Sequence, residues 1–142
     1  MTKPRPIIKN TTYLLTRRCS RRRFLLEPSA TVNQVFTYCM GIAQEKYGLA
    51  IHAICAMGNH YHLIATDTKG ELPKFMHWMH EFVAKNLNVH HGRDEAFWKP
   101  GSYNAVKLAD YEAIVDKMVY TLNNPVAAGL VLGGRVKSGR LW

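Results

Sequence analysis

The chain has 142 residues, of which 47% are hydrophobic and 20% charged, and its formal net charge is +9. This length and composition predict one globular domain and exclude a mainly disordered chain. The positive charge favours a polyanionic partner, with nucleic acid ahead of an anionic membrane surface. The longest apolar stretch, 49–57, is too short to cross a membrane and contains His52, so we expect no membrane-spanning segment.

Three cysteines are spread along the chain, at Cys19, Cys39 and Cys55. Their number is odd and no two have the spacing of a CxxC motif. We therefore expect neither structural disulfides nor a metal site made of cysteines alone. A reducing cytoplasm is the compartment that fits this pattern best.

Turn residues and hydrophobic periodicity divide the chain into alternating strands and helices. The expected elements are, in chain order, a strand over 11–18, a helix from Ser29 to Gly48, strands over 49–56 and 60–66 joined by a tight turn, a helix from Leu72 to Gly92, a strand over 102–107 and a helix from Asp110 to Pro125. This β-α-β-β-α-β-α order predicts an α+β, ferredoxin-like sandwich. We expect an antiparallel sheet with the helices packed on one face.

Two histidines lie two residues apart on the third expected strand. Because side chains alternate between the faces of a strand, His60 and His62 should point the same way, with Tyr61 on the opposite face. Two neutral imidazoles on one rigid strand can chelate a divalent ion. The alternative is a pair of hydrogen-bonded histidines on a half-exposed sheet. His80, on the following helix, is expected to face solvent.

The last helix carries a tyrosine away from its expected apolar stripe. Tyr120 lies opposite the centre of that stripe, and Asn124 follows it by one helical turn. A carboxamide there could serve as a third metal ligand, close to the tyrosine hydroxyl. A free phenol is a weak nucleophile at neutral pH, and a nearby cation and base would activate it. Lys117 could assist or bind phosphate; the alternative is an ordinary exposed tyrosine.

Two segments resemble a known family. Residues 57–64, MGNHYHLI, resemble the His-hydrophobic-His (HUH) motif, and residues 120–131, YTLNNPVAAGLV, resemble the catalytic helix of the single-tyrosine HUH transposases. Both segments match the REP-associated tyrosine transposase group, which is IS200-like. The motifs occur in the expected order, and the similarity covers roughly residues 11–131.

The resemblance implies a single HUH nuclease or transposase domain over 1–142, with a ferredoxin-like fold and a C-terminal region that is short for the family. It implies Mg²⁺ or Mn²⁺ held by His60, His62 and Asn124. It also implies that Tyr120 attacks single-stranded DNA, forms a 5′-phosphotyrosine and frees a 3′-OH, at hairpins of repetitive extragenic palindromes. The protein would then be a bacterial, DNA-associated cytoplasmic enzyme, either a monomer or a homodimer.

A cluster of arginines follows the first strand and is a candidate DNA phosphate-binding surface. Its members are Arg17, Arg18, Arg21, Arg22 and Arg23. The alternative is a solvated loop that only aids solubility. Two other functions remain open for the chain as a whole: a catalytically silent nucleic-acid-binding domain of the same fold, and a metal-dependent phosphoesterase that uses water in place of tyrosine. Tyr103 and Tyr111 are rival nucleophiles, but neither has an asparagine four residues on.

Overall fold

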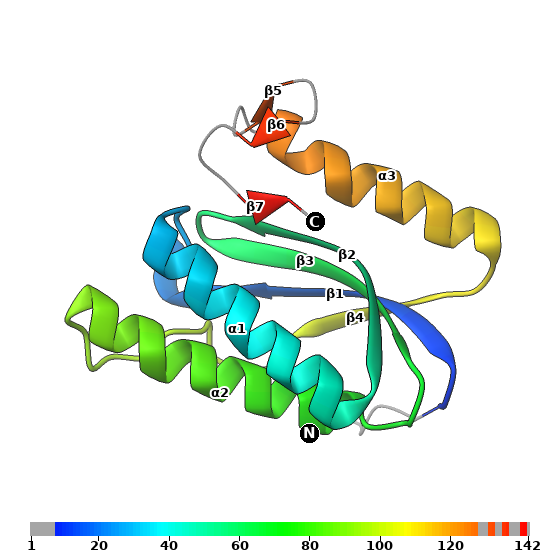
Figure 1. Ribbon diagram of the computed structural model, residues 1–142, viewed down its shortest axis with the longest axis horizontal. Helices are drawn as coiled ribbons and strands as arrows, with labels where there is room; N and C mark the ends of the chain where they lie inside the picture. Colours follow the sequence, from blue (N-terminus) through cyan, green and yellow to red (C-terminus); the bar gives the residue numbers. More distant parts are fainter. Residues whose placement is uncertain (1–7, 128–130, 133–134, 137–139, 142) are drawn as a thin grey trace.

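The computed structural model describes residues 8–127, 131–132, 135–136 and 140–141 (Figure 1). The main elements follow one another in the predicted order, and short strands are added at the end of the chain. In chain order they are β1 (Thr11–Arg18), the short 3₁₀ helix η1 (Ser20–Arg22), α1 (Ala30–Tyr47), β2 (Leu49–Met57), β3 (His60–Asp67), α2 (Leu72–His91), β4 (Asn104–Leu108), α3 (Tyr111–Ala127), β5 (Val131–Leu132), β6 (Arg135–Val136) and β7 (Arg140–Leu141).

The main sheet is antiparallel throughout and has the strand order β4-β1-β3-β2-β7. β1 and β3 are its central strands, and their ladder runs from Thr11 opposite Asp67 to Arg18 opposite His60. The β2–β3 hairpin places Met57 opposite His60. The sheet order therefore puts the two histidines of β3 on a central strand, with a neighbouring strand on each side.

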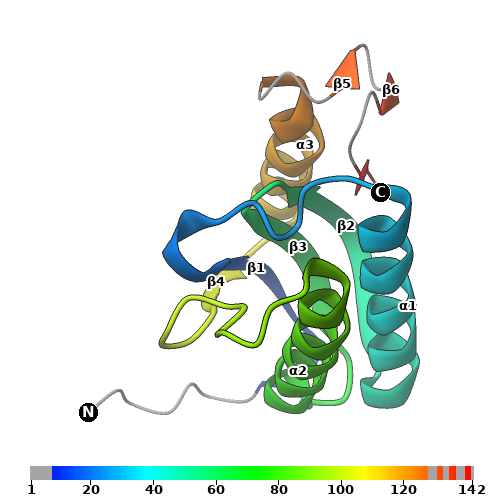
Figure 2. The same cartoon turned by 90° about the vertical axis from the view of Figure 1, so that its left-hand side faces the viewer.

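Two helices cover one face of the sheet, as predicted. α1 and α2 lie side by side over the face that carries Leu15, Tyr61 and Leu63, and together they enclose the larger apolar core (Figure 1). α3 instead packs on the opposite face, so that the sheet lies between α3 and α2 (Figure 2). The reason lies in the strands: Leu14 and Ile64, which alternate with the core residues, form a second apolar surface that α3 covers.

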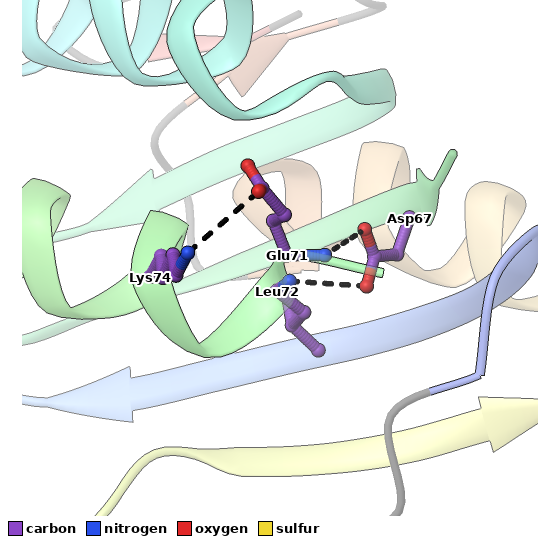
Figure 3. A network of polar contacts seen from close by, with 4 residues as sticks. All are labelled: Asp67, Glu71, Leu72 and Lys74. Carbon is purple, nitrogen blue, oxygen red and sulfur yellow. Dashed lines mark hydrogen bonds and ion pairs between the residues drawn. The ribbon is translucent and has the colours of Figure 1, made fainter. Parts of the chain in front are cut away.

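Local signals define where the first two helices begin and end. Ser29 accepts a hydrogen bond from the Val32 amide at 3.1 Å, and Gly48 ends α1 with a left-handed backbone, as predicted. α2 begins differently, because Asp67 at the end of β3 accepts the amides of Glu71 and Leu72, both at 3.0 Å (Figure 3). This buried carboxylate joins the end of a central strand to the start of the next helix.

The third helix differs from the prediction in length and in phase. Asp110 caps it as expected, but the helix continues past Pro125 to Ala127. Val119, placed in the predicted apolar stripe, is exposed, whereas Thr121 is fully buried. The face that packs on the sheet is therefore rotated toward Tyr120, which lies at its flank rather than opposite it.

Cys19, Cys39 and Cys55 are all buried and free. Within the described residues, no helix is both long enough and apolar enough to span a membrane.

Candidate active site

His60 and His62 share one face of β3, as the strand alternation predicted. Their ring centroids are 5.0 Å apart, and the rings meet edge to face. His60 Nδ1 lies 2.7 Å from Asn59 Oδ1, and His62 Nδ1 lies 3.3 Å from Thr16 Oγ1 on β1. An amide oxygen only accepts hydrogen bonds, so His60 Nδ1 carries the proton and its Nε2 keeps a free lone pair. The pair is thus oriented by partners that leave the Nε2 atoms available.

The surroundings keep both imidazoles neutral. Burial lowers the pKa of His60, and the nearby positive charge of Arg18 lowers it further. Burial, His60 and Arg18 together lower the pKa of His62 to about 4. A metal-binding imidazole must be unprotonated, and these shifts remove the competing proton at neutral pH. The electrostatics of the pair therefore fit a metal ligand better than a charged surface histidine.

Tyr120 reaches the histidine pair from a separate element. Its ring centroid lies 5.9 Å from that of His62, edge to face, and its side chain is 51% exposed. Lys117, one turn earlier on α3, places its Nζ 5.6 Å from the centre of the Tyr120 ring. The fold thus brings together an imidazole pair, an accessible phenol and a cation, within one chain.

Asn124 lies in α3, one turn after Tyr120, but its side chain is outside the described part of the structure. Among the described residues, no group of three His, Cys, Asp or Glu side chains could hold a metal ion. A ligand set built on the histidine pair would therefore need a donor of another kind, such as an amide. Two imidazoles and an amide would leave positions free for phosphate oxygens and water.

The arginine cluster divides into two parts. Arg18, Arg21, Arg22 and Arg23 are exposed, as a phosphate-binding surface requires. Arg17 is half-buried and differs: one terminal nitrogen lies 3.2 Å from His80 Nδ1, and the other donates to the Lys99 and Gly101 carbonyl oxygens at 3.3 and 3.2 Å. Arg17 alternates with Arg18 along β1, so it occupies the opposite face of the sheet. Its guanidinium is engaged within the fold, and contact between Arg17 and DNA stays a prediction.

A buried polar network under the histidine pair was not predicted. Tyr61 Oη lies 2.6 Å from His80 Nε2, and the Trp98 indole donates to the His80 carbonyl oxygen at 2.9 Å. His80 is 4% exposed, so the expectation that it faces solvent is wrong. Since Arg17 can only donate, His80 Nδ1 must accept, and the proton is on Nε2, which donates to Tyr61. The helical spacing of His80 within the apolar stripe of α2 was the available signal.

The solved structures that share this fold include the following two. The first is the structure of a REP-associated tyrosine transposase bound to a REP hairpin, with a TM-score of 0.71 and 21% sequence identity over 92% of this chain and 76% of that one. The second is a protein of Deinococcus radiodurans described as a transposase, with a TM-score of 0.57 and 18% identity over 84% of this chain and 96% of that one. These similarities show that the chain shares the fold of both proteins.

The family follows from the sequence. The family model described as "Transposase IS200 like" matches residues 7–115, well over half of the chain. The protein therefore belongs to the IS200-like transposase family and is a DNA transposase. The matched range contains His60 and His62 but ends before Lys117, Tyr120 and Asn124. No curated protein is similar enough in sequence to count as a match.

Proposed function

We propose that this transposase cleaves and rejoins single-stranded DNA with Tyr120 as the nucleophile, at a site that holds Mg²⁺ or Mn²⁺ through His60, His62 and Asn124. The observation that carries the proposal is the edge-to-face contact of Tyr120 with His62, whose ring centroids are 5.9 Å apart. The two residues come from different elements, and packing of α3 on the sheet brings them together.

The proposed reaction exchanges one ester for another. The Tyr120 hydroxyl oxygen attacks the phosphorus of a phosphodiester, and the bond from phosphorus to the 3′ oxygen breaks. The phenol proton passes to solvent and the leaving 3′ oxygen takes up a proton, which gives a 5′-phosphotyrosine and a free 3′-OH. Attack of a 3′-OH on the phosphotyrosine reverses these steps, so joining needs no external energy source.

Each residue has a distinct part in this proposal. A bound divalent ion supplies Lewis-acid polarisation of the scissile phosphate. The His60 and His62 imidazoles, neutral and oriented by Asn59 and Thr16, are ligands that fit such an ion. Lys117, with its Nζ 5.6 Å from the Tyr120 ring, adds positive charge where the phosphate charge must be balanced.

The DNA partner is proposed from the same considerations. The net charge of +9 and the exposed arginines after β1 favour a polyanion. The hairpin in the related solved structure supports hairpin DNA with a single-stranded segment as the substrate. We place the reaction in a bacterial cytoplasm.

The test is a denaturing gel of labelled hairpin DNA incubated with the protein and Mn²⁺ or Mg²⁺, with and without a chelator. We expect a metal-dependent covalent protein–DNA adduct that Tyr120→Phe abolishes. Tyr111→Phe is the matched control, because Tyr111 lies on the same helix and is 80% exposed. Cleavage without an adduct, unchanged in Tyr120→Phe, would replace the proposal with a water-using phosphoesterase. DNA binding without cleavage across several hairpins would favour a silent binding domain.

A further inference from the structure

The segment that joins β1 to α1 is fixed against the turn that precedes the histidine pair. We call residues 19–26 the basic loop. Its Cys19 amide donates to the Asn59 carbonyl oxygen at 2.8 Å, and its Leu26 amide donates to the Gly58 carbonyl oxygen at 2.9 Å. The loop is therefore held at both ends against the 57–59 turn, next to His60. A ligand on this loop would lie beside the proposed reaction centre.

One aromatic side chain of the basic loop is displayed to solvent. Phe24 is 65% exposed, although phenylalanine is among the residues most often buried. Its ring lies against Gly58, so closely that a Cβ at position 58 would be 2.7 Å from Phe24 Cδ1. The turn thus supports one side of the ring and leaves much of it uncovered. A supported, exposed ring among arginines matches the stacking platforms that bind unpaired bases.

A cationic pocket lies between the basic loop and the neighbouring residues Arg18 and Lys99. It has a volume of about 230 Å³ and is lined by Arg18, Cys19, Arg21, Arg22 and Lys99. Four of these five side chains are positively charged, and none takes part in the ion pairs found among the described residues. Unpaired cations around a pocket of this kind favour an anion as its occupant.

The backbone of the loop has a conformation that residues other than glycine rarely adopt. Arg21 and Arg22 have φ values of 51° and 57°, in the left-handed region. Each such residue costs roughly 1 kcal/mol, so two in succession persist only where the surrounding contacts impose them. The hydrogen bonds of Ser20 and Arg23, at 2.8 Å to the Phe97 carbonyl oxygen and 3.0 Å to the Ser20 carbonyl oxygen, provide those contacts. The backbone that carries Arg21 and Arg22 is therefore held in place by these bonds.

We propose that the basic loop is a binding subsite for single-stranded DNA, in which Phe24 stacks on an unpaired base and the pocket of Arg18, Arg21, Arg22 and Lys99 holds a phosphate of the same strand. Its position follows from the register, since Arg18 is paired with His60 across one strand spacing of about 5 Å. The subsite therefore takes a nucleotide close to the phosphate that is cut. The position of this nucleotide relative to the cut phosphate rests on the proposed function, whereas the binding of DNA to the loop does not.

Binding is measured by fluorescence anisotropy of labelled oligothymidylate, on the Tyr120→Phe protein without added metal, so that no strand is cut. We expect Phe24→Ala to weaken binding roughly 5- to 150-fold, because stacking on an aromatic side chain contributes that much per base. Phe24→Trp should retain binding, and neither change should alter the salt dependence. Tyr38→Ala is the matched control: Tyr38 is 69% exposed, on α1, and its replacement should leave binding unchanged.

The role of the pocket is tested by the salt dependence of DNA binding. Replacing Arg21 and Arg22 with glutamine should reduce the slope of log affinity against log salt by about 0.7 for each phosphate that the protein no longer neutralises. Lys46→Gln, at the other end of α1, is the control and should leave the slope unchanged. Thermal unfolding of each variant checks that the fold is kept. A blunt-ended duplex of the same length should be insensitive to Phe24→Ala, since its bases are already stacked.

The subsite is overturned if Phe24→Ala binds oligothymidylate as tightly as its parent, or if Tyr38→Ala weakens binding equally. It is also overturned if the glutamine variant keeps the full salt slope. Failure of the proposed function shows separately, as the absence of a covalent adduct from the protein that carries Tyr120. An adduct with no effect of Phe24 would leave the transposase reaction standing and remove this subsite.

Discussion

Replacing His80 with leucine should destabilise the protein more than the small change in side-chain volume suggests. Leucine fills a similar volume but offers nothing to Tyr61 Oη at 2.6 Å or to the Arg17 guanidinium at 3.2 Å. Tyr61 is fully buried, so no water replaces the missing imidazole there, whereas half-buried Arg17 can recover one. A buried polar group that loses its partner costs about 1–3 kcal/mol. We therefore expect a loss of about 2–3 kcal/mol, which lowers Tm by about 5–12 °C.

A double-mutant cycle separates the hydrogen bond from packing. Tyr61→Phe alone removes the hydroxyl and leaves the buried Nε2 proton of His80 unpaired. With Tyr61→Phe and His80→Leu together, neither group is orphaned, so the double variant should be about 1–2 kcal/mol more stable than the sum of the single effects predicts. The assay is urea unfolding followed by circular dichroism. His77→Leu is the control, since His77 lies on the same helix and its side chain is 83% exposed.

Three results would refute the reasoning. The first is a loss below about 0.5 kcal/mol for His80→Leu, the size expected of an ordinary surface change. The second is strict additivity of the two substitutions, which would show that Tyr61 and His80 do not interact. Equal effects of the His77 and His80 changes would likewise remove the argument from burial.

We also expect the stability of the protein to depend on pH through His80. Burial and Arg17 hold the pKa of His80 in the folded protein well below its ordinary value. Below pH 6.5 the unfolded chain therefore binds more protons than the folded one. Stability should therefore fall as the solution is acidified through pH 6.5, by up to about 1.4 kcal/mol per pH unit from this one group, and urea unfolding should show a shallower fall in His80→Gln. At the start of α2, Asp67→Ala removes the buried carboxylate that accepts two capping hydrogen bonds of 3.0 Å. This change should lower the free energy of unfolding by about 1–3 kcal/mol in the same assay. An unchanged unfolding midpoint would exclude a capping role for Asp67. At the site, His62→Ala should abolish the metal-dependent adduct in the gel assay while leaving oligothymidylate binding intact; adduct formation at the parent rate would remove His62 from the ligand set.

Local chemistry made much of the fold predictable. Ser29 and Gly48 bound α1 because a side-chain cap and a left-handed glycine act within one turn of the helix. The shared face of His60 and His62 follows from strand alternation alone. These features depend on neighbours in the sequence, and the structure confirms each of them.

Other features depend on contacts between distant parts of the chain. Arg17 belongs by sequence to a basic cluster, but its side chain meets His80, 63 residues away, a contact that its neighbours in the sequence do not reveal. Likewise, the strand pattern could not reveal that the face with Leu14 and Ile64 would be covered by a helix rather than by solvent. Pro125 was assigned to the end of α3 because proline usually ends a helix, but α3 continues to Ala127.

The placement of Tyr120 shows how these two kinds of feature combine. Its helix packs on the sheet through Ile114, Met118 and Leu122, which are only partly buried, whereas α1 and α2 contribute many fully buried side chains to the larger core. Burial of apolar area dominates stability, so α3 contributes less to the fold than the other helices do. The proposed nucleophile thus lies on a weakly buried helix and the histidine pair on a central strand. Substitutions at the α3–sheet contact should therefore change the distance between Tyr120 and His62 while lowering the global stability only slightly.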